Sequence, residues 1–220
     1  MNFIRKNWYY IGGVLCVVLG ATLALHWNDI STLRRLMLVS LMALQLHQLE
    51  EYAWPGGFPA VFNLAVHPTG SRPDRCPLNR LSVLVVNWGV AYLFYAFGIY
   101  FSHVIWLGLG VVLVGMAQLG FHGVFVARKM RTLYNPGLFT SAFLFWPIGI
   151  YYIWYVVSNG LVQWWMWPVA VVIFVVVAVF GVNGPIALFK NENSPYPFSE
   201  EEMARFQVRE KMERQNAKKT

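Results

Sequence analysis

The chain has 220 residues, of which 57% are hydrophobic and only 12% are charged, and its mean hydropathy is +0.48. Soluble proteins contain about 25% charged residues, so this composition excludes a soluble domain and predicts a helical membrane protein with several spans. The formal net charge of +7 does not indicate nucleic-acid binding, because no soluble domain is present to hold a basic patch. The two cysteines, Cys16 and Cys76, are too few for a disulfide framework.

Six apolar segments of spanning length follow one another along the chain, which predicts an all-α, polytopic transmembrane bundle in residues 1–190. We expect the spans near residues 8–27, 33–54, 81–101, 104–127, 138–158 and 161–185. Residues 55–80 are rich in proline and polar residues, which predicts a loop that is re-entrant or acts as a lid.

Residues 191–220 differ in composition and are expected to form a charged helical tail. Ser199 and Glu202 have the spacing of a capping box, in which each side chain bonds the backbone N–H of the other residue. Glu201 precedes Arg205 by four residues, the favourable order for an ion pair on a helix. The tail is therefore predicted to be a solvated helix.

The basic residues predict the orientation of the bundle. With six spans, 15 of the 17 Lys and Arg residues fall on the side that holds both termini, and only Arg34 and Arg35 fall on the other. Cytoplasmic loops of membrane proteins are enriched in Lys and Arg. Both termini are therefore expected to be cytoplasmic.

A polar cluster at the end of the second span is the most unusual feature of the sequence. His47, Glu50 and Glu51 stand at positions i, i+3 and i+4, so a helix presents all three on one face. Ionisable groups at membrane depth are costly unless they pair, face water or bind a metal. The predicted topology places this cluster in the cytoplasmic half of the membrane.

The same topology brings further polar residues to that half of the membrane. His122 lies one to two turns from the cytoplasmic end of the fourth span, and His67 lies in the loop that follows the second span. Imidazole and carboxylate groups are ligands of Zn²⁺ and of Fe²⁺. We therefore predict a divalent-metal site, Zn or Fe, with ligands from His47, Glu50, Glu51, His122 and His67. Glu50 and Glu51 are the candidate catalytic residues, and the candidate substrate or supporting contacts are Asn63, Asn87, Asn135 and Asn183.

Several of these residues belong to a recognisable pattern. The stretch His47-Gln48-Leu49-Glu50-Glu51 is followed by Pro-Gly-Gly-Phe-Pro at 55–59 and Asn63, then by His122, and then by Tyr-Asn-Pro-Gly at 134–137 with Thr140. Over most of residues 36–150 the chain resembles the HXXEE family of small integral membrane proteins. The resemblance implies that these residues act together. The family name describes a motif and implies no activity.

Three functions fit these observations. The leading one is a membrane-embedded, metal-dependent enzyme acting on a hydrophobic or lipid-like substrate. In the second, one of the two adjacent carboxyl groups of Glu50 and Glu51 stays protonated and acts as the acid of a metal-free isomerase or cyclase. The third is a proton-coupled transporter, since intramembrane Glu and His residues are typical of proton relays. A purely structural alternative has both carboxylates reaching the interface to pair with Arg80 or Arg128.

Overall fold

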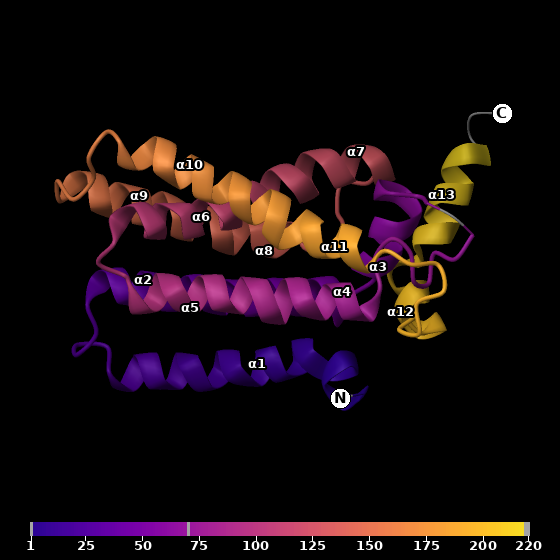
Figure 1. Cartoon of the computed structure of the whole chain (residues 1–220), viewed down its shortest axis with the longest axis horizontal. Coiled ribbons are helices and arrows are strands. Elements are labelled where there is room, and N and C mark those ends of the chain that lie inside the picture. Colours follow the sequence, from indigo (N-terminus) through magenta and orange to yellow (C-terminus); the bar gives the residue numbers. More distant parts are fainter. Residues whose placement is uncertain (1, 70, 218–220) are drawn as a thin grey trace.

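The computed structural model describes residues 2–69 and 71–217, and the elements found there are helical (Figure 1). Six long helices run side by side along the longest axis of the molecule. The first two are α1 (Asn2–Leu25) and α2 (Thr32–Tyr52). The other four combine α4 (Arg80–Leu84), η2 (Val85–Ala91) and α5 (Tyr92–Tyr100); α6 (Ile105–Leu119), η3 (Gly120–Val126) and α7 (Ala127–Met130); α8 (Leu138–Thr140), η4 (Ser141–Phe145) and α9 (Trp146–Ser158); and α10 (Met166–Val176), η5 (Val177–Asn183) and α11 (Gly184–Phe189).

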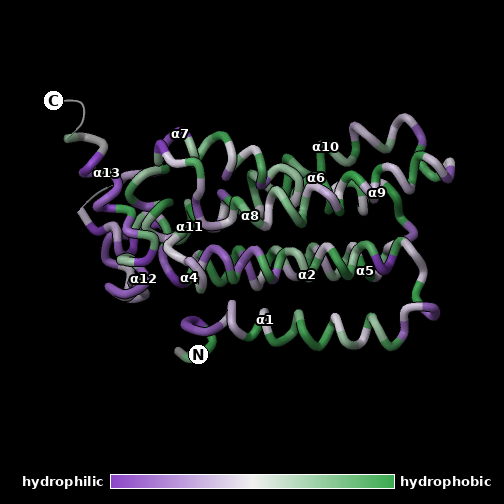
Figure 2. The backbone as a smooth tube through the Cα atoms, turned by 180° about the vertical axis from the view of Figure 1, so that it is seen from behind, coloured by the Kyte–Doolittle hydropathy of each residue, from purple (hydrophilic) through white to green (hydrophobic). Residues whose placement is uncertain are grey.

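Five helices of the described chain are long and apolar enough to cross a membrane. They are Phe3–Leu25, Arg80–Tyr100, Ile105–Met130, Leu138–Ser158 and Met166–Phe189. Figure 2 shows hydrophobic residues along these helices and hydrophilic residues gathered in the tail and the loops. The predicted all-helical class is therefore confirmed, and the protein is a polytopic membrane protein.

The sixth long helix, α2, is less apolar but lies within the bundle, where it packs along α1. Ser31 begins this helix by accepting a hydrogen bond from the Arg34 N–H at 3.4 Å. The helix ends before Pro55, and both following glycines adopt positive φ, 70° at Gly56 and 92° at Gly57. Left-handed backbone of this kind favours glycine because a side chain would clash with the backbone.

The labels η2, η3, η4 and η5 mark π-helical segments within the four later long helices. A fifth such segment, η1 (Val61–Val66), follows α3 (Phe58–Ala60) in the loop after α2. The π-turns in membrane helices lie toward the end of the bundle that also holds this loop and the tail (Figure 1). Such turns are rare and occur frequently at functional sites, which directs attention to this half of the bundle.

The loop after α2 is folded compactly and lies over one end of the bundle. Asn63 holds it together, because its Nδ2 donates to the carbonyl oxygens of Pro73 and Leu78, both at 2.8 Å, while its Oδ1 accepts from the Leu78 N–H at 3.0 Å. Phe58 and Val61 are buried in the same core as Trp8 of α1. The loop is therefore part of the packed structure.

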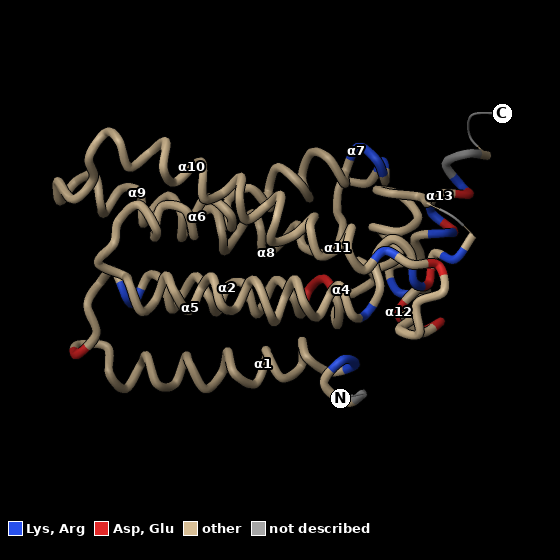
Figure 3. The backbone as a smooth tube through the Cα atoms, viewed as in Figure 1, with Lys and Arg blue, Asp and Glu red and all other residues tan. Residues whose placement is uncertain are grey.

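The tail packs against this loop through α12 (Glu200–Ala204) and α13 (Val208–Ala217), a contact that the sequence did not predict. The predicted capping box of Ser199 and Glu202 is formed. Glu202 also forms an ion pair with Arg80 at the start of α4. Arg205 donates to the carbonyl oxygen of Tyr52, the last residue of α2. These contacts fix the tail to the end of the bundle, where most charged residues gather (Figure 3).

Candidate metal centre

Three side chains that are far apart in the sequence converge inside the bundle. His47 and Glu51 come from α2, and His122 comes from η3; their exposed fractions are only 4%, 6% and 0%. Glu51 Oε1 lies 3.7 Å from His47 Nε2 and 3.4 Å from His122 Nε2. One ligand atom from each of the three residues lies within 4.8 Å of the other two.

Hydrogen bonds assign the proton of the His47 ring. His47 Nδ1 lies 2.8 Å from the Oγ1 of Thr140, and that hydroxyl donates to Glu50 Oε2 at 2.5 Å. A hydroxyl has one proton, so toward His47 the Thr140 oxygen acts as an acceptor. The ring proton therefore resides on Nδ1, and Nε2 presents a lone pair toward Glu51.

His122 is held in the same way by a different partner. Its Nδ1 lies 2.8 Å from Asn135 Oδ1, and the Nδ2 of Asn135 donates to the backbone oxygen of His122 at 2.8 Å. This second bond fixes which end of the amide faces the ring, so Nδ1 is again the donor. The buried Nε2 of His122 has no hydrogen-bond partner in the described chain.

Three acceptor atoms thus face one another with no donor between them in the part of the chain that the structure describes. A buried carboxylate with no donor is costly, and a cation at this point removes the cost. Bonds of about 2.1 Å at tetrahedral angles would separate neighbouring ligand atoms by roughly 3.4 Å. The two separations from Glu51 Oε1, 3.7 and 3.4 Å, are close to this value. The geometry therefore fits a small divalent cation.

Aromatic rings and a glycine enclose the cluster. The centroid of Phe145 lies 5.3 Å from that of His47, and the centroids of Phe58 and Phe121 lie 5.7 and 5.1 Å from that of His122. A Cβ atom at Gly137 would stand only 2.4 Å from His122 Cε1. The backbone at Gly137 therefore packs directly on the imidazole ring.

Glu50 has a different environment from Glu51. Its Oε1 accepts from the Tyr134 hydroxyl at 2.9 Å and from the Phe139 N–H at 3.0 Å, and its Oε2 accepts from the N–H and the hydroxyl of Thr140 at 2.8 and 2.5 Å. These N–H groups lie in the first turn of the helix that begins at α8, where no intrahelical acceptor exists. Glu50 therefore anchors the start of this helix to α2.

Comparison with known proteins covers this same region. The family model described as "Protein of unknown function with HXXEE motif" matches residues 38–152, just over half of the 220 residues. The chain belongs to the HXXEE family. No curated protein and no solved structure matches it. The HXXEE region contains His47, Glu51 and His122, together with the side chains that bond them, so the family pattern and the buried cluster coincide.

The other predicted site residues lie elsewhere or have structural partners. His67 is exposed at the end of η1, its ring 5.0 Å from that of Phe62 and outside the cluster. Asn63 bonds the loop backbone, and exposed Asn183 donates to the Ala178 carbonyl at 2.8 Å. Asn87 accepts from Gln48 at 3.2 Å. Among the four asparagines, Asn135 is the one that contacts a histidine of the cluster.

Two residues received no role from sequence reasoning although they contact the site. Tyr134 and Thr140 both donate to Glu50, and Thr140 also accepts from His47. The sequence did contain a signal for a role at the site, because both residues lie close to the Asn-Pro-Gly turn of the HXXEE pattern. Thr140 also stands in the first helical turn, where backbone N–H groups attract a carboxylate.

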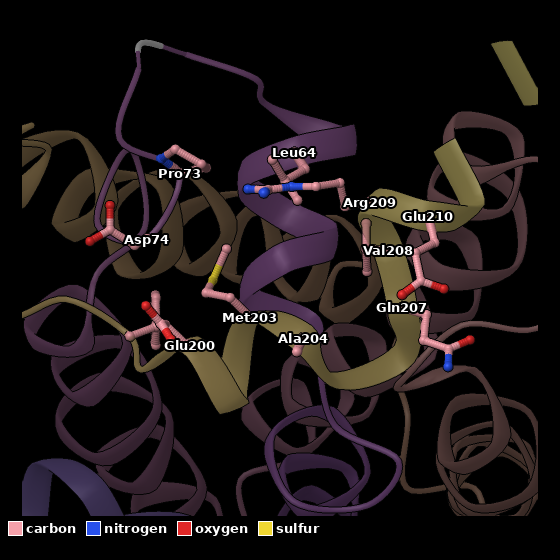
Figure 4. Close-up of a pocket in the computed structure, with 11 residues that line it drawn as sticks. Leu64, Pro73, Asp74, Glu200, Met203, Ala204, Gln207, Val208, Arg209 and Glu210 are labelled. Atoms are coloured by element: carbon pink, nitrogen blue, oxygen red, sulfur yellow. The ribbon is translucent and has the colours of Figure 1, made fainter. Parts of the chain in front are cut away.

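A cavity of about 530 Å³ lies between the tail and the loop that follows α2. Figure 4 shows Leu64 and Met203 facing each other across it, with Asp74, Glu200 and Glu210 around the edge. None of the three cluster residues lines it. The cavity therefore marks the contact between tail and loop, and the chemistry of the buried cluster is separate from it.

Proposed function

We propose that this protein is a membrane-embedded enzyme that binds one divalent cation through His47, Glu51 and His122 and acts on a hydrophobic or lipid-like substrate. The observation that supports it is the convergence of three buried acceptor atoms on one point. Each imidazole is oriented by a hydrogen bond at its other nitrogen, as is usual for metal-binding histidines.

The three ligand side chains limit which metals the site is expected to bind. Two imidazoles and one carboxylate form the ligand set of many catalytic zinc sites and of the facial triad of non-haem iron(II) oxygenases. Both sets leave coordination positions open for water or substrate. The cofactor is accordingly Zn²⁺ or Fe²⁺, and a bound cation of this kind polarises a substrate oxygen or activates water.

The protein residues have separate parts in this proposal. Glu51 is the carboxylate ligand, while Glu50, whose oxygens accept four hydrogen bonds, fixes the start of α8 against α2. Thr140 and Asn135 orient the two imidazoles. The aromatic rings of Phe58, Phe121 and Phe145 form apolar walls, and the surrounding bilayer favours an apolar substrate.

We further propose that α2 is the sixth span and that both termini are cytoplasmic. The first residues of α1 and the tail lie at the same end of the bundle (Figure 1), and Lys and Arg are concentrated at that end (Figure 3). Arg34 and Arg35 lie at the opposite end. This distribution fits the positive-inside rule and supports the proposed orientation, in which the metal site lies in the cytoplasmic half of the membrane.

One observation favours the metal-free alternative. The 3.4 Å between Glu51 Oε1 and His122 Nε2 is also short enough for an ion pair with a protonated imidazole. In that case the pair would hold a proton in place of a cation and serve as the acid–base group of the enzyme.

Elemental analysis separates the two alternatives. The protein is purified without a polyhistidine tag or chelator, and its metal content is measured by mass spectrometry beside the variants His47→Ala, Glu51→Gln and His122→Ala. We expect about one equivalent of Zn or Fe in the wild type and in the control His67→Ala, whose histidine is exposed, and almost none in the three variants. A metal-free wild type would overturn the metal proposal.

Enzymatic activity needs a second measurement. Membrane lipid extract is incubated with the wild type and with Glu51→Gln, and the lipids consumed and formed are compared by mass spectrometry. We expect the wild type to change at least one lipid class that the variant leaves unchanged. Identical lipid profiles for the two proteins would argue against an enzyme.

A further inference from the structure

The tail contacts both loops of the HXXEE pattern through one short turn, η6 (Arg205–Gln207), which lies between α12 and α13. A Cβ atom at Gly57 would stand 2.5 Å from the backbone oxygen of Arg205 and 2.9 Å from Phe206 Cβ. The ring of Phe206 also lies 5.9 Å from the ring of Tyr134. The turn therefore joins the Pro-Gly-Gly-Phe-Pro loop to the Tyr-Asn-Pro-Gly turn.

Each of these two contacts is one residue away from a neighbour of the metal cluster. Gly57 precedes Phe58, whose ring centroid lies 5.7 Å from that of His122. Tyr134 precedes Asn135, whose Oδ1 lies 2.8 Å from His122 Nδ1. The tail turn is therefore close to the same imidazole along two separate paths.

Apolar residues of the tail on both sides of this turn are buried in the bundle. Phe198, before the turn, is 5% exposed, and Val208, directly after it, is 1% exposed. Both belong to the hydrophobic core that contains Phe58 and Val126. Figure 1 shows α12 and α13 at the end of the bundle beside α3, where α12 contacts α3 and α13 contacts η1 and α7. The tail therefore covers the part of the core that adjoins the cluster.

The covered end of the bundle is the short way for water to reach the cluster. Glu51 stands next to Tyr52, the last residue of α2, at the end where charged residues gather (Figure 3), whereas the long sides of the bundle face lipid. Arg205 donates to the Tyr52 carbonyl, and a Cβ atom at Gly56 would stand 2.8 Å from Arg205 Cδ. A solute that approaches Glu51 from this end therefore meets the tail first.

The backbone of the tail turn is strained. Phe206 and Gln207 have φ of 59° and 50°, values that residues other than glycine rarely adopt. Side-chain contacts hold this conformation, among them Lys211 Nζ, 3.1 Å from the centroid of the Phe206 ring. Strained backbone occurs often at switch regions. Because the strain is relieved when these contacts are lost, the turn favours a tail that can detach.

We propose that η6 and the helices beside it form a lid, and that water and metal ions reach His47, Glu51 and His122 from the aqueous side only when this lid opens. An apolar substrate that arrives from the bilayer does not need the opening. The inference rests on the proposed metal site and adds control of access to it. The lid lies outside residues 38–152, the part of the chain that the family model matches.

Chemical modification of histidine tests the lid without requiring a bound metal. The full-length protein in lipid nanodiscs is treated with a chelator and then with diethyl pyrocarbonate, which acylates neutral imidazole, and the modified peptides are followed over time by mass spectrometry. We expect His122 to react at least tenfold faster in Phe206→Ala than in the wild type, because loss of the packed ring raises the population of the open form. Exposed His67 is the internal reference and should react equally in both.

Two further variants give this measurement a second direction and a control. Gln207→Gly relieves the backbone strain and keeps the Phe206 ring, so it should slow the modification of His122 by about threefold. Slower modification cannot result from misfolding. The control is Leu133→Ala, which removes an apolar side chain that is 99% exposed in the loop before Tyr134; His122 should react in it as in the wild type.

Metal exchange separates the lid from the proposed function. The wild type and Phe206→Ala are loaded with Zn²⁺, and transfer of the metal to EDTA is followed over time. We expect equal zinc content and at least tenfold faster release from the variant, as for the modification of His122. A wild type that binds no zinc would contradict the metal site, whereas the modification rates would still decide on the lid.

Two results would overturn the lid. The first is zinc that is bound by both proteins and released at equal rates. The second is equal modification of His122 in the wild type, Phe206→Ala and Gln207→Gly, which would show that solutes reach the cluster by a path that avoids the tail.

Discussion

Thr140 and Glu50, 90 residues apart in the chain, are joined by two hydrogen bonds, because Glu50 Oε2 accepts from both the N–H at 2.8 Å and the hydroxyl at 2.5 Å of Thr140. The same hydroxyl accepts from His47 Nδ1 at 2.8 Å. The carboxylate therefore fixes the hydroxyl, and the hydroxyl fixes the imidazole. Glu50 therefore helps to orient His47, although it is not one of the three candidate metal ligands.

The first prediction concerns the hydroxyl of Thr140. Thr140→Val keeps the shape of the side chain but leaves the Nδ1–H of His47 without an acceptor. Loss of such an outer-shell partner typically weakens metal binding by about 10- to 100-fold. We expect that weakening here, measured by competition with a chromophoric zinc chelator.

Two further variants give this measurement its controls. Thr140→Ser restores a hydroxyl and should recover most of the affinity. Ser141→Ala removes a neighbouring buried hydroxyl whose hydrogen bond in the described structure goes to the Gly137 carbonyl at 2.5 Å. If Ser141→Ala weakened metal binding as much as Thr140→Val, a general packing effect would explain both.

The two adjacent glutamates should respond differently to the same substitution. Glu50→Gln replaces an acceptor oxygen by an NH₂ group that faces N–H and O–H donors. The lost charge-assisted bonds should destabilise the protein by about 3 kcal/mol, seen as a lower melting temperature in detergent. Glu51→Gln should abolish metal binding with a much smaller change in the melting temperature of the metal-free protein. The opposite pattern would exchange the roles assigned to the two residues.

The fold class could be predicted from composition and apolar segment length, and five long apolar helices confirm it. The π-helical turns could not be predicted, because a π-turn depends on tertiary packing. The segments that form these turns are rich in Val, Gly and Phe and have no distinctive local sequence pattern. The position of the tail was also missed. Its capping box and the pair of Glu201 and Arg205 are local and predictable, but its bonds to Arg80 and Tyr52 join distant parts of the chain.

For the candidate site, helical spacing placed His47, Glu50 and Glu51 on one face, and topology placed His122 at the same depth. Spacing could not show that Glu50 turns toward Thr140 while Glu51 turns toward the imidazoles, because that division depends on the position of α8. His67 shows that a residue of suitable chemistry can be predicted as a ligand and still lie outside the site. Its side chain has suitable chemistry for a ligand, but the fold of the loop leaves it exposed.

Gly137 should tolerate no side chain, for two separable reasons. Its φ of 101° is unfavourable for other residues, and its Cα packs against the His122 ring. Gly160 also has a positive φ, of 64°, but no atom lies within 4 Å of an added Cβ. A side chain at Gly160 would therefore meet the backbone strain without the ring contact. Gly160→Ala should cost about 1–2 kcal/mol. Gly137→Ala should cost more and also lower the metal content, both measured on purified protein. Equal costs, with metal retained in both, would show that the ring contact is unimportant.

The last prediction concerns the attachment of the tail. Arg205 donates to the Tyr52 carbonyl at the end of α2 and pairs with Glu201 at 2.9 Å. The next residue, Phe206, packs its ring 5.9 Å from the ring of Tyr134. The Tyr134 hydroxyl in turn donates to Glu50. Arg205→Gln removes the charged donor, and a hydrogen bond to a charged group stabilises by about 1.5–3 kcal/mol.

Chymotrypsin provides the measurement, because it cleaves after Phe206 only when this segment leaves Tyr134. We expect at least tenfold faster cleavage there in Arg205→Gln, since proteolysis follows the population of the open form. The control is Arg209→Gln, which makes the same charge change at an exposed position lining the tail cavity; its cleavage rate should equal that of the wild type. Because Tyr134 links Phe206 to Glu50, opening of the tail should also loosen the start of α8. Hydrogen exchange at the Phe139 and Thr140 N–H groups should therefore rise in Arg205→Gln alone, and unchanged exchange there would show that the tail and the metal cluster are independent.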